Sequence, residues 1–369
     1  AGQLRRLRTI DPIGDNGVCS EGRELVDFSS NDYLGLASHP LLKARAVKFT
    51  ERYGTGARAS RLISGSYPSF EKVEATLAGL KRTERALILN SGFQANISLL
   101  PALADRDAAI LLDRHCHNSL VNGALLSRAR VRRYRHGDLD HLRELLVASS
   151  DCVQRIIATE SVFSMDGDTS DIKALVAVAR EYDALLVIDE AHATGVLGER
   201  GMGLTCGMGV DVCVGTFGKA LGSFGAYIAC GEKMAEYLVN CCAGFIYTTA
   251  LPPAVLGSID AALELVPTMD EERSALLKNA ACVRAALRAQ GWDTGVATTQ
   301  VIPVMVGDEC KALALHRYLE DRGCLAVAIR PPTVAPGQSR IRLALNVHHR
   351  REDLKILVEL FGQWRDGCD

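Results

Sequence analysis

The sequence predicts an α/β protein whose large domain contains a mostly parallel central sheet, followed by a smaller α+β domain. Three observations support this fold class. Short apolar runs recur from about residue 84, amphipathic helical segments separate several of them, and the pattern changes after the proline-containing stretch 247–255. Continuous apolar strands that alternate with helices are typical of a parallel sheet covered on both faces.

The expected strands of the large domain come one after another along the chain. They are five apolar runs, at residues 86–90, 108–113, 155–160, 184–190 and 211–215. Residues 171–182, "DIKALVAVAREY", have the spacing of an amphipathic helix between the third and fourth runs. Before these runs, residues 1–50 contain one short strand pattern, "ELVDFSS" at 24–30.

A different arrangement is expected after residue 255. A long helical stretch covers about 256–290, and apolar strands then alternate with helices near 310–322 and 351–365. This order of strands and helices predicts a smaller α+β domain. The predicted division has three parts, an N-terminal segment, a large domain and a small domain, at residues 1–50, 51–258 and 259–369.

Composition and charge argue against several classes of protein. The chain carries 42 Lys and Arg against 44 Asp and Glu, a formal net charge of -2, unlike the basic balance of a nucleic-acid-binding protein. Its apolar runs are far shorter than the roughly 20 residues that a membrane-spanning helix needs. The twelve cysteines include no CxxC spacing, and no leader-like segment is evident, so we expect reduced thiols, no metal site and a cytoplasmic protein.

Candidate ligand-binding residues lie directly after the apolar runs, because ligands of open parallel sheets bind beyond the carboxyl ends of the strands. Gly92 and Phe93 come after the first run and precede a helix, where exposed N–H groups suit a phosphate or form an ordinary cap. His117 comes after the second run and either faces a ligand or is an ordinary loop or core histidine. Ser164 comes after the third run, in a loop that either binds a ligand or forms a turn.

The fourth run ends in "DEAH", residues 189–192, which has two incompatible interpretations. In a nucleotide-driven helicase this element serves magnesium and water, but that function also needs a GxxxxGK[ST] loop. The chain contains none, since only two residues separate the glycines of "GTFGKA" and Ala220 stands where a hydroxyl is required. In the other interpretation Asp189 pairs with a pyridinium N–H and His192 reaches the hydroxyl of the same ring.

Lys219 lies in "GTFGKALGSFG", residues 215–225, as one lysine among four glycines. It could bind a phosphate, form a covalent bond to a cofactor, or be an exposed turn lysine without a role. The phosphate-loop spacing is missing, and an idle lysine does not account for the partners at the other strand ends. Pyridoxal 5'-phosphate (PLP) needs a phosphate cradle, an acid for its ring nitrogen, a flat partner for its ring and one lysine, and all four occur here.

These motifs resemble the α-oxoamine synthases, which are PLP-dependent enzymes of the aspartate-aminotransferase fold, also called fold type I. The resemblance covers nearly the whole chain, and the segments that carry it are "FSSNDYLGLASHP", "GARASRLISGS", "LNSGFQAN", "SVFSMDGD", "DEAHATGVLGERG", "TFGKALG" and "YTTALPP". It implies an acyltransferase in which an amino acid condenses with an acyl thioester and CO2 is lost. It also implies a homodimer with active sites at the subunit interface.

The resemblance also implies roles for individual residues. Lys219 is the Schiff-base lysine, Asp189 holds the ring nitrogen, and His117 stacks on the ring. The other cofactor contacts implied are Gly92, Phe93, Ser164, His192, Thr216, Thr248 and Thr249, the last two from the neighbouring subunit. Substrate contacts are implied for Arg5, Asn31, His117, Thr333 and Arg342. Arg6 remains an alternative to Arg5, and Arg340, on the same strand face by period-2 geometry, remains an alternative to Arg342.

The choice of substrate is implied by a shorter segment. "AIRPPTV", residues 328–334, resembles the members of the group that use L-alanine and a pimeloyl thioester carried by CoA or by a carrier protein. Three rival functions stay open: a sister synthase that uses glycine or serine, a plain aminotransferase and an inactive subunit of such a complex. The presence of Lys219 together with Asp189 and His117 argues against the inactive subunit.

Overall fold

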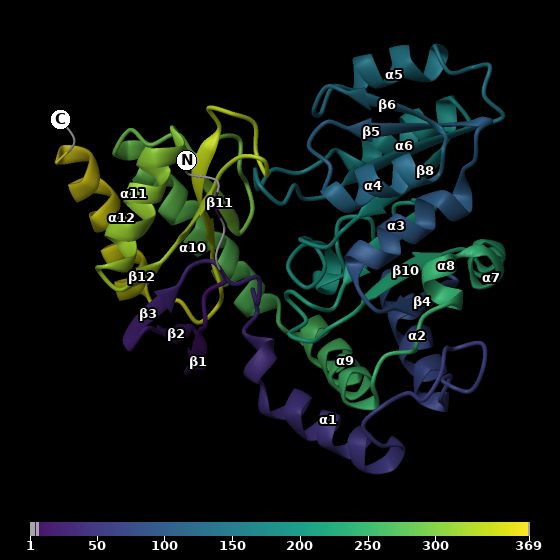
Figure 1. Ribbon diagram of the computed structural model, residues 1–369, viewed down its shortest axis with the longest axis horizontal. Helices are drawn as coiled ribbons and strands as arrows, with labels where there is room; N and C mark the ends of the chain where they lie inside the picture. Colours follow the sequence, from purple (N-terminus) through teal and green to yellow (C-terminus); the bar gives the residue numbers. More distant parts are fainter. Residues whose placement is uncertain (1–3, 5–6, 368–369) are drawn as a thin grey trace. The chain divides into compact units, whose positions relative to one another are not determined.

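The computed structural model describes residue 4 and residues 7–367, and the chain divides into two compact units (Figure 1). The first unit consists of Ala1–Gly35, Ser164–Thr169 and Glu271–Asp369. The second unit consists of Leu36–Phe163 and Ser170–Asp270. In the part of the chain that the structure describes, no helix is long and apolar enough to cross a membrane.

The second unit is built on a seven-stranded sheet with the order β4-β10-β9-β8-β7-β5-β6. Its strands are β4 (Arg85–Leu89), β5 (Ala108–Asp113), β6 (Arg130–Tyr134), β7 (Gln154–Glu160), β8 (Leu185–Asp189), β9 (Val212–Thr216) and β10 (Ala226–Cys230). All neighbours from β6 to β9 pair in parallel, and β10 runs antiparallel to both β9 and β4. The predicted mostly parallel sheet is therefore confirmed, with all five predicted strands in it.

Two strands of this sheet, β6 and β10, were not predicted from the sequence. β6 has the sequence "RVRRY" and lies at the edge of the sheet, where its arginines can reach solvent, so it lacks an apolar run. β10, "AYIAC", comes after β9 and a glycine-rich turn without an intervening helix, so its short run reads as part of the loop. An edge position and a direct reversal thus account for both omissions.

Helices cover both faces of the large sheet. The helices of this unit are α1 (Pro40–Tyr53), α2 (Pro68–Lys81), α3 (Gly92–Leu103), α4 (Asn118–Leu126), α5 (Leu139–Val147), α6 (Ile172–Glu181), α7 (Glu232–Cys241), α8 (Ala243–Ile246) and α9 (Pro253–Leu265). Alternate strand residues enter two apolar clusters: Ile156 packs with side chains of α3 and α4, and Ile157 packs with those of α5 and α6. Helices α1 and α9 pack alongside one another (Figure 1).

The first unit contains two small sheets. One has the order β1-β2-β3-β12, formed by β1 (Asp11–Ile13), β2 (Gly17–Ser20), β3 (Arg23–Asp27) and β12 (Cys324–Leu325). The other is antiparallel with the order β11-β14-β13, formed by β11 (Val301–Gly307), β13 (Val327–Ile329) and β14 (Ser339–Ala344). The helices α10 (Asp270–Ala289), α11 (Glu309–Glu320) and α12 (Arg351–Asp366) complete this part, and the expected α+β character is confirmed.

Two expectations about individual elements were wrong. The helical stretch expected over 256–290 is interrupted, because α9 ends at Leu265 and α10 begins at Asp270, with the 3-10 turn η3 (Val266–Thr268) between them. Pro267 lies in that turn and has no N–H to continue a helix. The N-terminal region contains three strands where one was expected, since β1 and β2 are only three and four residues long.

Candidate functional site

The predicted cofactor and substrate residues are distributed over both units. The second unit contains Gly92, Phe93, His117, Asp189, His192, Thr216, Lys219, Thr248 and Thr249. The first unit contains Asn31, Ser164, Thr333 and Arg342. Arg5, and Arg6 as its alternative, lie outside the residues that the structure describes.

Lys219 is presented by a tight reversal between β9 and β10. The N–H of Phe217 donates to the carbonyl of Gly225 at 2.9 Å, and the N–H of Ser223 donates to the carbonyl of Phe217 at 2.9 Å. Gly222 has a φ of +60°, and a Cβ there would lie 2.4 Å from the backbone nitrogen of Ala37. Only glycine fits that position, so the glycines hold the lysine-bearing turn in one conformation.

The amine of Lys219 lies beside the turn that comes after β8. Its Nζ is 2.8 Å from Nε2 of the buried His192. Three residues before His192, Asp189 accepts hydrogen bonds at both carboxylate oxygens: Oδ1 from the N–H of Ala191 at 2.8 Å and Oδ2 from Nδ2 of Asn96 at 2.6 Å. Buried charges are stable only when donors surround them, so this carboxylate is fixed in place as an acceptor.

A chain of hydrogen bonds connects Asp189 to His117. Nδ2 of Asn96 also donates to Oγ of Ser119 at 2.9 Å, and that Oγ lies 2.8 Å from Nδ1 of His117. The backbone N–H of Ser119 donates to the same Nδ1 at 3.3 Å, so this nitrogen is an acceptor and the ring proton is on Nε2. Burial lowers the pKa of His117, the Asp189 carboxylate opposes this, and the positive charge of Lys219 lowers the pKa further. The imidazole is therefore held neutral.

Asn96 and Ser119 are functional candidates that the sequence analysis missed. Asn96 is fully buried, and no described residue donates to its Oδ1. An orphaned buried acceptor costs free energy, and here it results from both N–H groups being directed at Asp189 and Ser119. A Cβ at Gly123 would lie 2.4 Å from the carbonyl oxygen of Asn96, which shows how closely α3 and α4 approach at this point. The available signal was the spacing, since Asn96 lies one helical turn after Gly92.

The N-terminus of α3 offers two amides to an anion. Ser91 caps the helix: its hydroxyl and its carbonyl accept hydrogen bonds from the third and fourth amides of the first turn. Among the described residues, none accepts from the N–H groups of Gly92 and Phe93, which leaves them for a ligand. A Cβ at Gly92 would lie 4.0 Å from Cβ of Thr216, so the turn after β9 borders this cradle. The Thr216 hydroxyl itself donates to the carbonyl of Gly225 at 2.9 Å.

Thr248 and Thr249 lie beside the end of β4 of their own chain. Nδ2 of Asn90 donates to Oγ1 of Thr248 at 3.0 Å and to the carbonyl of Thr249 at 2.9 Å. Asn90 directly precedes Ser91, the cap of the anion cradle. The role of these threonines toward a neighbouring subunit stays a prediction.

In the first unit, Arg342 brings Ser164 and Asn31 together. Nε of this buried arginine donates to the carbonyl of Ser164 at 2.7 Å, and Nη1 and Nη2 both donate to Oδ1 of Asn31 at 3.3 Å. Within the described part of the chain, no carboxylate lies within ion-pairing distance of Arg342. Two positions earlier on β14, Arg340 forms an ion pair with Asp166 at 2.6 Å. Because Arg340 already has an anionic partner, Arg342 is the better candidate to receive a carboxylate.

Glu190, the second residue of "DEAH", has a structural role. It is fully buried and forms an ion pair with the buried Lys81, whose Nζ also donates to the carbonyl of Met202 at 2.7 Å. The Glu190 carboxylate accepts from the N–H and the hydroxyl of Thr205 at 2.9 and 2.8 Å. Burial alone would raise the pKa of Glu190, but the Lys81 ammonium and the Thr205 donors lower it. A carboxylate that is occupied by an ammonium group and by two further donors is not placed to activate a water, which agrees with rejection of the helicase interpretation.

Comparison with known proteins gives consistent matches over nearly the whole chain. The sequence profile of the aminotransferase class I and II family matches residues 23–361. A protein of Desulfosudis oleivorans, provisionally named 8-amino-7-oxononanoate synthase, is 56% identical over 99% of this chain and 95% of its own. An 8-amino-7-oxononanoate synthase of Gluconacetobacter diazotrophicus is 51% identical over 93% of this chain and 89% of its own. A solved structure of a lysine-to-alanine variant of serine palmitoyltransferase from S. paucimobilis, with a bound PLP–myriocin aldimine, has a TM-score of 0.93 at 25% identity, covering 97% of this chain and 92% of its own.

Proposed function

This chain belongs to the aminotransferase class I and II family, and we propose that within this family it acts as an 8-amino-7-oxononanoate synthase. It would join L-alanine to the pimeloyl group of a thioester and release CO2 and the free thiol, a step in biotin synthesis. The observation that carries the proposal is the 2.8 Å approach of Lys219 Nζ to His192 Nε2, beside the donor-held Asp189 carboxylate. Two relatives that are 56% and 51% identical over the aligned residues carry this name, the first of them provisionally.

The residues present fit PLP. The N–H groups of Gly92 and Phe93, which no described residue uses, would hold its phosphate at the helix N-terminus. Asp189, fixed by two N–H donors, would accept the ring N–H, and Lys219 would bind the aldehyde. When bound, PLP supplies an aldehyde that captures the amino acid and a ring that accepts electron density from its α-carbon.

The protein's own groups then have distinct tasks. Lys219 Nζ is the base that takes the proton from the α-carbon of the amino acid, and His192 Nε2 orients it at 2.8 Å. His117, neutral and with its proton on Nε2, offers a flat uncharged face and one N–H donor. Asn96 keeps the Asp189 carboxylate in position, so that its negative charge stays directed at one site.

Arg342 would bind the carboxylate of the amino acid. Its two Nη groups share one neutral acceptor, Oδ1 of Asn31, at 3.3 Å, which is long for a hydrogen bond of a guanidinium. A carboxylate can replace that oxygen with two parallel charge-assisted bonds, which are stronger.

We also propose that the protein is a cytoplasmic homodimer in which Thr248 and Thr249 of one subunit reach the cofactor of the other. The second unit exposes aromatic side chains on loops and at helix ends, and aromatic residues are enriched at protein interfaces: Phe93, Phe224 and Tyr247. Analytical ultracentrifugation of the purified protein tests the dimer, and a monomeric mass at micromolar concentration would contradict it.

A substrate panel tests the proposed reaction. Purified protein is incubated with L-alanine, glycine or L-serine and with pimeloyl-CoA, the pimeloyl carrier protein or other acyl thioesters, and CO2, thiol and product are measured. We expect turnover with L-alanine and a pimeloyl thioester. The likeness to a serine palmitoyltransferase makes a sister synthase that uses L-serine the second candidate, and product with serine or glycine alone would establish it. Amino-group exchange without CO2 release would indicate an aminotransferase, and a lack of all turnover would indicate an inactive subunit.

A further inference from the structure

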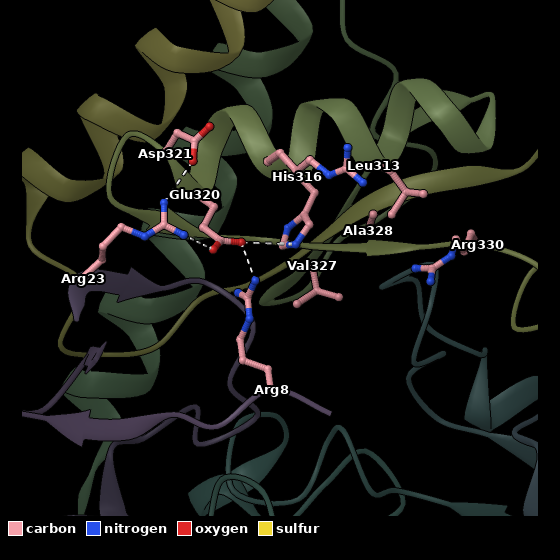
Figure 2. Close-up of a pocket in the computed structure, with 10 residues that line it drawn as sticks. Arg8, Arg23, Leu313, His316, Glu320, Asp321, Val327, Ala328 and Arg330 are labelled. Atoms are coloured by element: carbon pink, nitrogen blue, oxygen red, sulfur yellow. Dashed lines mark hydrogen bonds and ion pairs between the residues drawn. The ribbon is translucent and has the colours of Figure 1, made fainter. Parts of the chain in front are cut away.

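A pocket of about 370 Å³ lies in the first unit (Figure 2). Four arginines from separate parts of the chain line it, namely Arg8, Arg23, Arg317 and Arg330, and we call it the arginine pocket. They come from the N-terminal segment, from β3, from the last turn of α11 and from the residue directly after β13. None of these arginines has a role in the proposed chemistry.

Inside the pocket one buried carboxylate forms ion pairs with two of the arginines. Glu320 accepts from Arg8 at 2.6 Å and from Arg23 at 2.7 Å, and Arg23 also pairs with Asp321 at 2.9 Å. Figure 2 shows Arg8 and Arg23 pointing toward Glu320. His316 lies 3.5 Å from the same carboxylate through Nε2, while its Nδ1 contacts a backbone carbonyl at 2.8 Å. Four guanidinium groups against two carboxylates leave a formal charge of +2, without counting the histidine.

Part of the positive charge of the pocket lies on its α11 side. Arg317 is exposed, and among the described residues no carboxylate lies within ion-pairing distance of it. Nη2 of Arg330 donates to a neutral group, the carbonyl of Leu4, at 3.1 Å. Two guanidinium groups therefore line the pocket without contributing to the Glu320 ion pairs.

One residue of the pocket lining is a ladder partner of a residue proposed to bind substrate. Val327 lines the pocket and stands opposite Arg342 in the ladder between β13 and β14. Arg330 begins a turn in which the N–H of Thr333 donates to the Arg330 carbonyl at 3.1 Å. A ligand in the pocket can thus extend toward the substrate residues of the same unit.

We propose that the arginine pocket binds a phosphate group of the acyl donor. This inference rests on the proposed function, whose thioester is carried on a pantetheine arm that bears phosphate both in CoA and on a carrier protein. Arginine forks match phosphate oxygens in geometry, and a pocket charge of +2 complements a phosphate ester. The phosphate would anchor the donor while its thioester end extends toward Arg342.

The test compares donors with and without phosphate in the PLP-loaded protein. Arg317→Gln removes one positive charge without breaking a described ion pair, and Arg322→Gln, an exposed arginine outside the pocket lining, is the matched control. By calorimetry we expect Arg317→Gln to raise the Kd of CoA about 2- to 5-fold, as for one exposed charged contact. The KM of pimeloyl-CoA rises by the same factor, whereas kcat and the KM of pimeloyl-pantetheine, which has no phosphate, stay unchanged.

The outcomes separate the pocket from the proposed function. If only the KM of the pimeloyl carrier protein rises, the phosphate belongs to the carrier and the pocket assignment stands. If Arg317→Gln binds CoA and uses the carrier protein as the wild type does, or weakens pimeloyl-pantetheine equally, the pocket assignment is wrong although turnover continues. If no thioester is turned over while Arg317→Gln still weakens CoA binding, the proposed function fails and the phosphate site remains.

Discussion

The free energy of unfolding should depend less on pH when His349 is replaced. This buried residue donates from Nε2 to the carbonyl of Asp27 at 3.0 Å and accepts at Nδ1 from the N–H of Asn346 at 3.0 Å. Its ring also stacks on Phe28 with centroids 4.4 Å apart. One donor and one acceptor satisfy the neutral ring only, so protonation would break the Asn346 hydrogen bond.

The size of the effect is set by the pKa. Burial lowers the pKa of His349 from 6.5 to about 4. In the unfolded chain the ring regains its ordinary pKa, so between pH 6.5 and 4 the unfolded state binds more protons and stability falls as the pH falls. A pKa difference of about 2.5 corresponds to about 3 kcal/mol, fully present above pH 6.5 and lost by pH 4. About 2 kcal/mol of it is lost between pH 7.5 and 5.

The assay is urea unfolding at several values between pH 7.5 and 5. Because other groups titrate as well, the quantity of interest is the difference between His349→Gln and the wild type at each pH. The variant should lose about 2 kcal/mol less than the wild type over this interval. His348→Gln, at the exposed neighbouring position, is the control; its charge is the smallest of the influences on the pKa of His349, so this variant should stay much closer to the wild type than His349→Gln does. Parallel curves for wild type and His349→Gln would refute the reasoning.

Three further predictions concern the site. Lys219→Ala should abolish the covalent bond to PLP, seen as loss of the visible absorbance band and of the mass increment after borohydride reduction; an unchanged band would contradict the assignment. Asn96→Ala should lower kcat about 10- to 100-fold, since a donor to a buried carboxylate is lost, and shift the pH profile. Its free energy of unfolding should fall by only about 1 kcal/mol, because an unsatisfied Oδ1 disappears too; a large stability loss with normal kcat would mean a structural role only. Arg342→Lys should raise the KM of alanine at least about tenfold, whereas Arg340→Lys should mainly lower the unfolding temperature, and the reverse pattern would exchange their roles.

Much of the candidate site could be predicted because parallel strands place their carboxyl ends at one edge. Asp189 ends β8, Thr216 ends β9, and Gly92 opens the helix after β4, so the residues at the ends of the apolar runs already include the groups that we propose to hold PLP. The lysine was informative for a related reason. Lys219 lies on the glycine-rich turn that comes directly after Thr216, at the edge of the sheet where ligands bind. A single ammonium group at such a place indicates a role in binding or catalysis.

The remaining parts depend on contacts between segments far apart in the sequence. Asn96 and Ser119 meet only because α3 and α4 approach closely, and no local pattern shows this. Arg340 and Arg342 are equivalent by strand period, and only the Asp166 side chain, far away in the sequence, distinguishes them. The same limit applies to secondary structure, since an edge strand rich in arginine carries no apolar run.

The reversal that carries Lys219 has a consequence for how the protein acquires its cofactor. It joins two strands that are neighbours both in the chain and in the sheet, so its contacts close a short loop at little cost in chain entropy. Such a turn can therefore form during folding without help from a bound cofactor. We therefore expect the turn that carries Lys219 to form during folding whether or not PLP is present, so that protein prepared without PLP should be folded and should bind PLP when it is added.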